Sequence, residues 1–243
     1  MRQAEKVDLG SDDWTMEIRP YASAFHFPIK ELWEYRDLLF LFVRRDFKTM
    51  YKQTILGPAW ILLSPLLTTG MFSLIFGRIA GISTDGTPTF LFYMAGNILW
   101  NYFSSCLSAA SSTFIGNAGL FGKVYFPRIV VPASSAVSKL ITFGAQFLLF
   151  LILLFCSLGS GQVRITWLCL MTPVLLVMLA LLAIGTGMIL ASLTAKYRDL
   201  QVLVGFGVQL WMYASPIVYP LSQIPGKWRI PGQTPGLSPD RRW

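Results

Sequence analysis

The sequence predicts an all-α integral membrane protein, in which an amphipathic helix at the cytoplasmic membrane surface precedes five transmembrane helices. Hydrophobic residues make up 54% of the 243 residues and charged residues only 13%, whereas a soluble domain carries about 25% charged residues. The charges are also segregated, because nine of the twelve acidic residues lie within residues 1–46. Beyond that point, long apolar runs alternate with short basic segments, which is typical of multi-pass membrane proteins.

The same composition argues against several classes of function. The three cysteines fall inside apolar runs and the single histidine is His26, so neither a disulfide framework nor a Cys/His metal site is expected. The net charge of +8 is better explained by membrane topology than by nucleic-acid binding, because no basic stripe coincides with a soluble fold. We therefore expect no metal and no nucleic-acid partner.

Residues 30–52 predict the amphipathic helix in the cytoplasmic interface. Apolar side chains recur there at helical spacing, while charged side chains gather elsewhere on the helix, which brings cations close to lipid headgroups. The residues assigned to this helix surface are Leu39, Phe42, Arg44 and Arg45. A plain soluble start to the first membrane span is the alternative, and the break at Gly57 and Pro58 favours the interfacial helix.

Residues 53–219 form the predicted transmembrane domain. Five apolar runs reach the length of about 20 residues that a spanning helix needs. They cover residues 57–79, 89–115, 129–158, 165–193 and 200–219. The first run opens with Pro58, near a helical position where the missing N–H costs least. Pro65 and Pro173 fall inside the first and fourth runs, where neighbouring helices can compensate for a kink.

Basic residues orient these spans, because Lys and Arg concentrate on the cytoplasmic side of membrane proteins. Five of them lie within residues 36–52, and two follow each of the second and fourth spans, whereas the intervening loops carry only Arg78 and Arg164. The N-terminus is therefore predicted to be cytoplasmic. Residues 1–29 are acidic and lack an apolar signal-peptide segment, so we expect them to form a cytoplasmic tail.

The chain offers little for catalysis or ion coupling. After residue 46, the acids are Asp85, Asp199 and Asp240, each in a different loop or tail and none paired with a histidine. We therefore expect no enzymatic activity from this chain by itself. Lys139 is the only charge well within an apolar run, whereas ion-coupled transporters usually bury ionisable residues. Transport driven from outside the chain, or a membrane scaffold, is what remains.

One face of the second predicted span is polar. Asn97, Trp100 and Asn101 share helical spacing with three serines farther along the run. Small residues at every fourth position let helices approach closely, so helix packing explains the serines at least as well as a pore does. Amides beside a tryptophan would suit a wet pore for a hydroxyl-rich solute, and these first three residues are the candidates for its lining.

Residues 116–128, GNAGLFGKVYFPR, contain a Gly-Lys pair after a glycine-rich run. A phosphate-binding P-loop needs Gly, four residues, Gly-Lys and then Ser or Thr, but Asn117 stands at the first glycine position and Val124 follows Lys123. Because valine cannot ligate magnesium, we expect no nucleotide here. The aromatic and basic residues predict a loop that faces either lipid headgroups or a docking partner.

Four stretches of the chain resemble one known family. They are the interfacial LLFLFVRRDFKTMYKQTILGPAWILLSPLL, the loop GLFGKVYFPRIVVPAS, the turn TAKYRDL, and QLWMYASPIVYP in the fifth predicted span. Together they make roughly residues 30–229 similar to the membrane permease subunit of type-2 ABC exporters, the group that moves lipid-linked polysaccharides such as O-antigen and teichoic acid.

The resemblance implies a homodimeric permease in the bacterial inner membrane, powered by two separate ATPase subunits that hold ATP and magnesium, with no cofactor in this chain. It also implies that the loop after the second span docks on the ATPase. The docking residues would be Phe121, Lys123, Tyr125, Phe126 and Arg128. Aromatic residues would guide the glycan, since sugar rings stack on aromatic faces. The pore-lining candidates then extend to Trp211, Tyr213 and Tyr219.

Two other functions stay open, namely export of another lipid or a drug by the same kind of permease, and a non-transporting membrane scaffold. The family also continues into a sixth span, whereas residues 220–243 hold five prolines and no run of even eight apolar residues. Such a segment cannot form a spanning helix. We therefore expect an irregular tail on the external side, either a tolerated disordered segment or the product of a frameshift or truncation.

Overall fold

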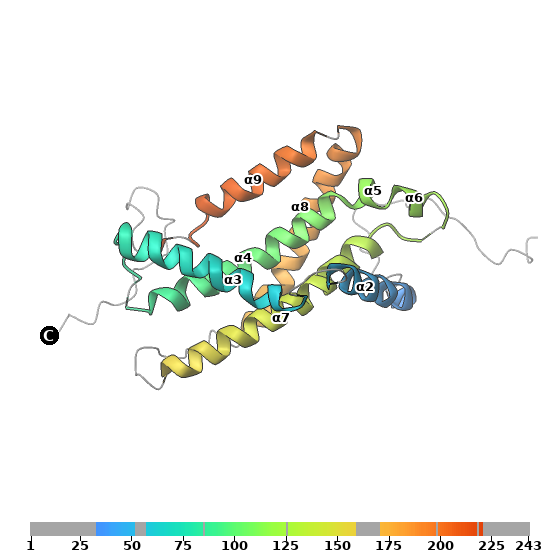
Figure 1. Cartoon of the computed structure of the whole chain (residues 1–243). Helices are drawn as coiled ribbons and strands as arrows, with labels where there is room; N and C mark the ends of the chain where they lie inside the picture. Colours follow the sequence, from blue (N-terminus) through green and yellow to red (C-terminus); the bar gives the residue numbers. More distant parts are fainter. Residues whose placement is uncertain are drawn as a thin grey trace, which may run out of the picture.

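A computed structural model describes residues 33–51, 57–84, 86–124, 126–158, 171–197, 199–217 and 219–220. Within these residues every regular element is a helix, which confirms the predicted all-α class (Figure 1). The longer helices are α2 (Arg36–Tyr51), α3 (Ala59–Phe72), α4 (Thr89–Ser111), α7 (Val130–Leu158), α8 (Thr172–Lys196) and α9 (Leu200–Ala214). A π-helical segment, η1 (Ser73–Ile79), continues α3.

Helix α4 forms the centre of the bundle, because α3, α7, α8 and α9 all contact it (Figure 1). Twelve of its 23 residues are buried. Its apolar residues, among them Met94, Ile98 and Leu107, pack with Phe143 of α7 and Ala183 of α8 into the main core. The interior of the protomer is therefore organised around the second predicted span.

Small residues set the spacing between α4 and α8. Gly187 of α8 lies directly against Ala110 of α4, and a Cβ on Gly187 would also come within 3.0 Å of the Leu107 carbonyl oxygen. Ala183 and Ala191, one helical turn to either side of Gly187, are fully buried. This row lets the two backbones approach closely, as small residues do between membrane helices.

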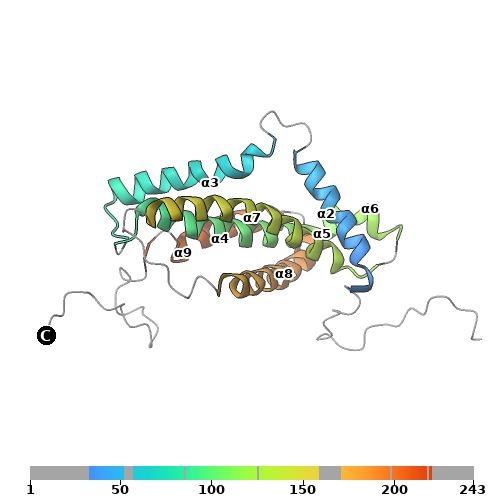
Figure 2. The ribbon, with the colours of Figure 1, turned by 90° about the horizontal axis from the view of Figure 1, so that it is seen from below.

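Helix α7 connects the central bundle with α2. Val130 and Val131 in its first turn pack against Phe42 of α2. Farther along, α7 lies beside α3 and α4 (Figure 2). Gln146 of α7 donates a 3.1 Å hydrogen bond from Nε2 to the carbonyl oxygen of Ile61 in α3. This bond uses a backbone acceptor within the first turns of α3 and fixes the two helices side by side.

Three helices in the described part of the chain are long and apolar enough to cross a membrane, namely Ala59–Ile79, Val130–Leu158 and Thr172–Lys196. They correspond to the first, third and fourth predicted spans. Helix α4 has sufficient length but does not reach the same apolarity. Helix α9 is apolar but has 15 residues, about 22 Å against a hydrocarbon core of about 30 Å. The count of five spans stays a prediction.

Proline positions correct two predicted boundaries. The sequence predicts Pro173 inside the fourth span, but α8 begins at Thr172 and places Pro173 in its first turn, where a backbone N–H would have no partner within the helix and proline therefore loses nothing by lacking one. The fifth span is predicted to reach Tyr219, whereas α9 ends at Ala214 and Ser215 is extended. Residues before a proline disfavour helical geometry, and Pro216 follows Ser215.

Helices α8 and α9 present large apolar side chains outward. Met178 and Ile189 of α8 and Phe206 and Leu210 of α9 are 62–69% exposed. None of the residues of α9 is buried. Such a continuous apolar surface is typical of helices that face lipid or another membrane protein.

Candidate functional site

The α4–α7 loop (residues 112–129) contains two short helices, α5 (Thr113–Gly116) and α6 (Ala118–Phe121). Asn117, between them, donates a 3.1 Å hydrogen bond from its side-chain amide to the Thr113 carbonyl oxygen. Thr194 of α8 donates its hydroxyl proton to the Ser111 carbonyl oxygen at 2.9 Å. These bonds fix the end of α4, so the loop starts from a defined position on the bundle.

An apolar cluster joins this loop to α2, and we call it the loop cluster. It consists of Phe42, Phe126, Val130 and Val131. The ring centroids of Phe42 and Phe126 lie 5.9 Å apart, and that of Phe121 lies 5.5 Å from Phe126. Edge and tilted contacts at these distances are the favoured geometry for aromatic pairs. The loop is therefore packed against both α2 and α7.

Two arginines cover aromatic rings at the same end of the bundle. The guanidinium carbon of Arg45 lies 4.8 Å from the centroid of the Phe42 ring, and that of Arg128 lies 5.7 Å from the centroid of Phe114. Arg45 also binds the Asp46 carboxylate at 2.8 Å. Both cations thus sit over apolar clusters while remaining exposed to solvent.

The residues predicted to dock on an ATPase divide into exposed and buried groups. Lys123 and Arg128 are exposed and Phe121 is partly exposed. Phe126 is only 5% exposed, which leaves little of its ring for a partner and gives it a packing role inside the loop cluster. Tyr125 lies outside the described residues. A docking function of these residues stays a prediction.

The apolar face that α2 exposes differs from the face that the spacing of apolar residues in the sequence indicates. Phe42 is 4% exposed and buried against protein, and Leu39 packs beside it. The exposed apolar residues of this segment are Trp33, Phe40, Leu41 and Phe47. Arg44 and Arg45 are exposed as well. The interfacial position of α2 stays a prediction, with this second face, rather than the first, available to lipid.

The pore-lining candidates on α4 lie mostly inside the protomer. Asn97 and Trp100 are 2% and 9% exposed. Asn101 is partly buried and donates a 3.3 Å hydrogen bond from Nδ2 to Oδ1 of Asn97. The polar stripe read from the sequence therefore includes contacts within α4 itself, and its role in a pore stays a prediction.

The candidates that follow α8 are more open. Trp211 and Tyr213 of α9 are 44% and 49% exposed. The Trp211 ring lies 6.3 Å from that of Trp100, centroid to centroid, in an edge-to-face contact. Tyr219 donates its hydroxyl proton to the Ala214 carbonyl oxygen at 3.2 Å. The structure thus brings two predicted aromatic residues together, one buried and one at the surface.

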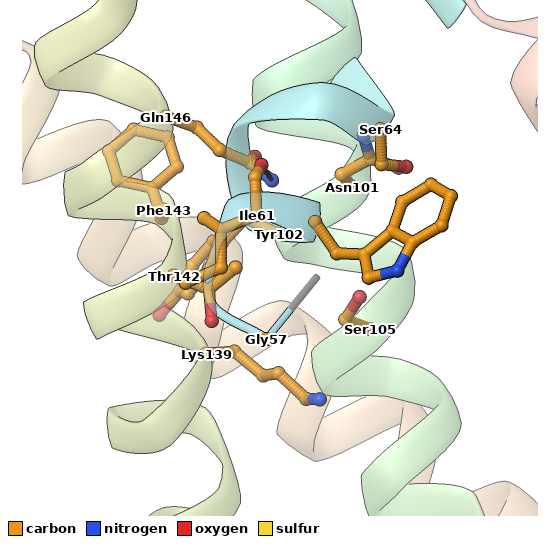
Figure 3. Close-up of a pocket in the computed structure, with 11 residues that line it drawn as sticks. Gly57, Ile61, Ser64, Asn101, Tyr102, Ser105, Lys139, Thr142, Phe143 and Gln146 are labelled. Carbon is orange, nitrogen blue, oxygen red and sulfur yellow. Dashed lines mark hydrogen bonds between the residues drawn. The ribbon is translucent and has the colours of Figure 1, made fainter. Parts of the chain in front are cut away.

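A cavity of about 300 Å³, with several polar side chains in a mainly apolar lining, lies among α3, α4 and α7 (Figure 3). Its polar lining residues come from all three helices: Ser64, Asn101, Ser105, Lys139, Thr142 and Gln146. The sequence identified one of these as a pore residue and another as an isolated charge. It did not reveal that α3 and α4 contribute hydroxyls and amides to the cavity that this charge also lines, because that arrangement depends on tertiary packing.

Comparison with known proteins fits this architecture. Residues 37–232 match the family described as ABC-2 type transporter. The O-antigen export system permease protein RfbA of Myxococcus xanthus is 32% identical over 196 residues, which cover 81% of this chain and 73% of that relative. Two proteins of the same name from Klebsiella pneumoniae are 28% and 29% identical, over 79% of this chain and 72% of each relative. The resemblance seen in the sequence is confirmed, and the chain belongs to the ABC-2 type transporter family.

Proposed function

We propose that this chain is the permease subunit of an ATP-driven transporter that exports a lipid-linked polysaccharide of the O-antigen type across the bacterial inner membrane. The observation that carries the proposal is the 32% identity with a Myxococcus O-antigen export permease over 81% of the chain. The outward apolar faces of α8 and α9 support a membrane location, because bilayer lipid would solvate them.

The energy would come from a separate ATPase subunit that holds ATP and magnesium and docks on the α4–α7 loop. Lys123 and Arg128 are exposed there, and Val124 adds an apolar side chain that is 54% exposed. Mixed cationic and apolar tips suit docking on a protein surface. Movement of the docked subunit would reach α2 and α7 through Phe126, since both helices pack on this ring.

The proposal includes a cytoplasmic N-terminus and a second copy of the chain. The cytoplasmic assignment rests on the basic residues around α2 and the α4–α7 loop. The second copy would cover part of α9, which buries no residue within its own protomer. Exposed Trp211 and Tyr213 on this helix offer ring faces on which a passing glycan would stack.

Deletion of the gene in its native host tests the proposal. We expect surface polysaccharide to disappear and its lipid-linked precursor to accumulate in the cell, with both effects reversed by the intact chain and its partner ATPase. Unchanged surface polysaccharide would overturn the proposal. A loss of lipid or drug export in its place would favour an exporter of another amphiphile, and an export-neutral deletion would favour a scaffold.

A further inference from the structure

Lys139 is the only charged residue of α7, and it lies nine residues after the helix begins at Val130. That position is about 13 Å along the helix axis. An ammonium group this far into an apolar helix is unfavourable unless it meets water or an opposite charge. Lys139 therefore marks a place where the protein has a use for a positive charge.

The cavity among α3, α4 and α7 has this ammonium at one end, and neutral hydrogen-bonding groups and apolar groups line the rest of it (Figure 3). In Figure 3 the Lys139 side chain extends from α7 toward α4, on the side of Ser105. None of the described lining residues is acidic. Lys139 also forms no ion pair with an acid in the described part of the chain. The positive charge is thus available to a ligand.

Two hydroxyls beside Lys139 also lack partners. Thr142 Oγ1 and Ser138 Oγ are enclosed by protein and have no hydrogen-bond partner among the described residues. Ser138 and Lys139 line a neighbouring cavity of about 350 Å³, together with Asp46 of α2. The Asp46 carboxylate is bound by Arg45 at 2.8 Å. The Thr142 and Ser138 oxygens make the wall beside Lys139 more polar without facing a cavity, and the accessible hydroxyl on the side to which Lys139 extends is that of Ser105 (Figure 3).

These groups suit a phosphate on a lipid. A phosphate ester offers several acceptor oxygens, and lysine binds phosphate as a point charge while hydroxyls and amides add further donors. The volume of about 300 Å³ lies at the lower limit of small-ligand pockets, which is enough for a headgroup but not for a glycan chain. Trp60 and Phe143 add apolar walls for the adjoining hydrocarbon. We propose that this cavity binds the phosphate group of a lipid headgroup, with Lys139 as the charged ligand.

Two kinds of lipid present this chemistry. One is a lipid-linked polysaccharide that is joined to its lipid through a phosphate or diphosphate, and this ligand assignment rests on the proposed function. The other is an anionic phospholipid of the membrane, and this assignment is independent of the proposed function. The experiment therefore measures binding of both, without requiring export.

The test uses the full-length chain in dodecyl maltoside micelles, which contain no phosphate, and native mass spectrometry of bound lipid. The titrants are a polyprenyl diphosphate, the polyprenol of the same length, and phosphatidylglycerol. The variants are K139Q, K139R and K48Q, of which the last removes an exposed lysine of α2 that lines neither cavity. Melting temperatures of all variants check folding.

We expect wild type to bind a phosphate-bearing lipid and not the polyprenol. K139Q should weaken this binding at least tenfold, which equals about 1.4 kcal/mol and is typical of a lost charge-assisted hydrogen bond. K139R should stay within about threefold of wild type, because it keeps the charge, and K48Q should match wild type. Weakening confined to the diphosphate assigns the cavity to the exported substrate, whereas weakening confined to phosphatidylglycerol assigns it to a structural lipid.

Equal binding by wild type and a folded K139Q overturns the proposal, and so does equal weakening in K139Q and K48Q. Should K139Q fail to fold, S105A is the second variant, with an expected two- to fivefold loss; unchanged binding by S105A then rejects the site. An unchanged polysaccharide after gene deletion would reject the proposed function while leaving these binding results intact. A negative binding result would conversely leave the export proposal standing.

Discussion

Helices α4 and α9 both arise from apolar runs predicted to span the membrane, yet they have opposite environments. Twelve of the 23 residues of α4 are buried, with Tyr93 and Met94 fully enclosed. None of the 15 residues of α9 is buried. The helix at the centre is also the one that does not reach the apolarity of the long spans.

The difference teaches that apolarity does not select the interior of a membrane protein. Lipid already solvates leucine and phenylalanine, so apolar burial gives little drive for helices to associate, and small or polar residues decide which faces meet. Helix α4 carries such small or polar residues at Asn97, Asn101 and Ala110, and Gly187 of α8 packs against Ala110. Helix α9 offers Phe206 and Leu210 to its surroundings instead.

The largest effect is expected where α4 meets α8. Gly187→Leu would place a side chain into Ala110 and the Leu107 carbonyl, so we expect a loss of more than about 4 kcal/mol in the free energy of unfolding and little folded protein. Yield and chemical unfolding in detergent measure it. Gly185→Leu is the control, because nothing lies within 4 Å of a Cβ there. Equal free energies of unfolding of the two variants would contradict close packing between α4 and α8 and remove the contrast between α4 and α9.

The second-largest loss of stability is expected in the loop cluster, which buries side chains outside the core around α4. Phe126→Ala removes a buried ring from the contacts with Phe42 and Phe121, and we expect a loss of about 3 kcal/mol in the free energy of unfolding. With the partner ATPase, less polysaccharide should be exported per ATP hydrolysed. Val124→Ala, at a side chain that is 54% exposed, is the stability control. A Phe126→Ala protein as stable as Val124→Ala would show that the cluster does not hold the loop.

A smaller effect tests one buried hydrogen bond between the central helix and α8. Thr194→Val removes the 2.9 Å bond to the Ser111 carbonyl oxygen, and we expect a loss of about 1 kcal/mol in the free energy of unfolding. Thr186→Val is the matched control, because its hydroxyl bonds the Leu182 carbonyl of its own helix on an exposed face. If both variants lose the same stability, the interhelical bond contributes nothing specific.

The smallest effect is expected on α9. Phe206→Ala shortens a side chain that is 62% exposed, and we expect the free energy of unfolding of the detergent-solubilised monomer to change by less than about 0.5 kcal/mol. Thermal unfolding measures it. A loss of several times that amount would place Phe206 inside the protomer and remove the contrast with α4. Comparison of dimer yield in nanodiscs then shows whether a second copy covers this helix.

The sequence predicts the membrane class and most helix positions because hydropathy acts on each residue regardless of its partners. The third predicted span, 129–158, differs by a single residue from α7, which covers Val130–Leu158. Predictions fail where proline geometry decides, as at Pro173 and Pro216, or where length is inferred from apolarity alone, as in α9. Hydropathy alone is therefore sufficient to place α7, but it does not determine where α8 begins or where α9 ends.

The remaining differences between the predicted and the observed candidate site arise from contacts between residues that are distant in the sequence. Helical spacing groups Leu39 with Phe42 on α2, but it cannot tell whether protein or lipid covers them, and the structure buries Phe42 against Phe126. The same holds for Trp100, which meets Trp211 across 111 positions of sequence. A single sequence carries the residue types of such contacts but not their pairing.

The contact between Phe42 and Phe126 joins residues that lie 84 positions apart, with α3 and α4 between them. During synthesis α2 leaves the ribosome first, and the Phe42 ring lacks its partners Phe126, Val130 and Val131 until both later helices have been made. At 5–20 residues per second this interval is roughly 4–17 s. Helix α2 can therefore take its final position against Phe126 only after α3 and α4 have been made.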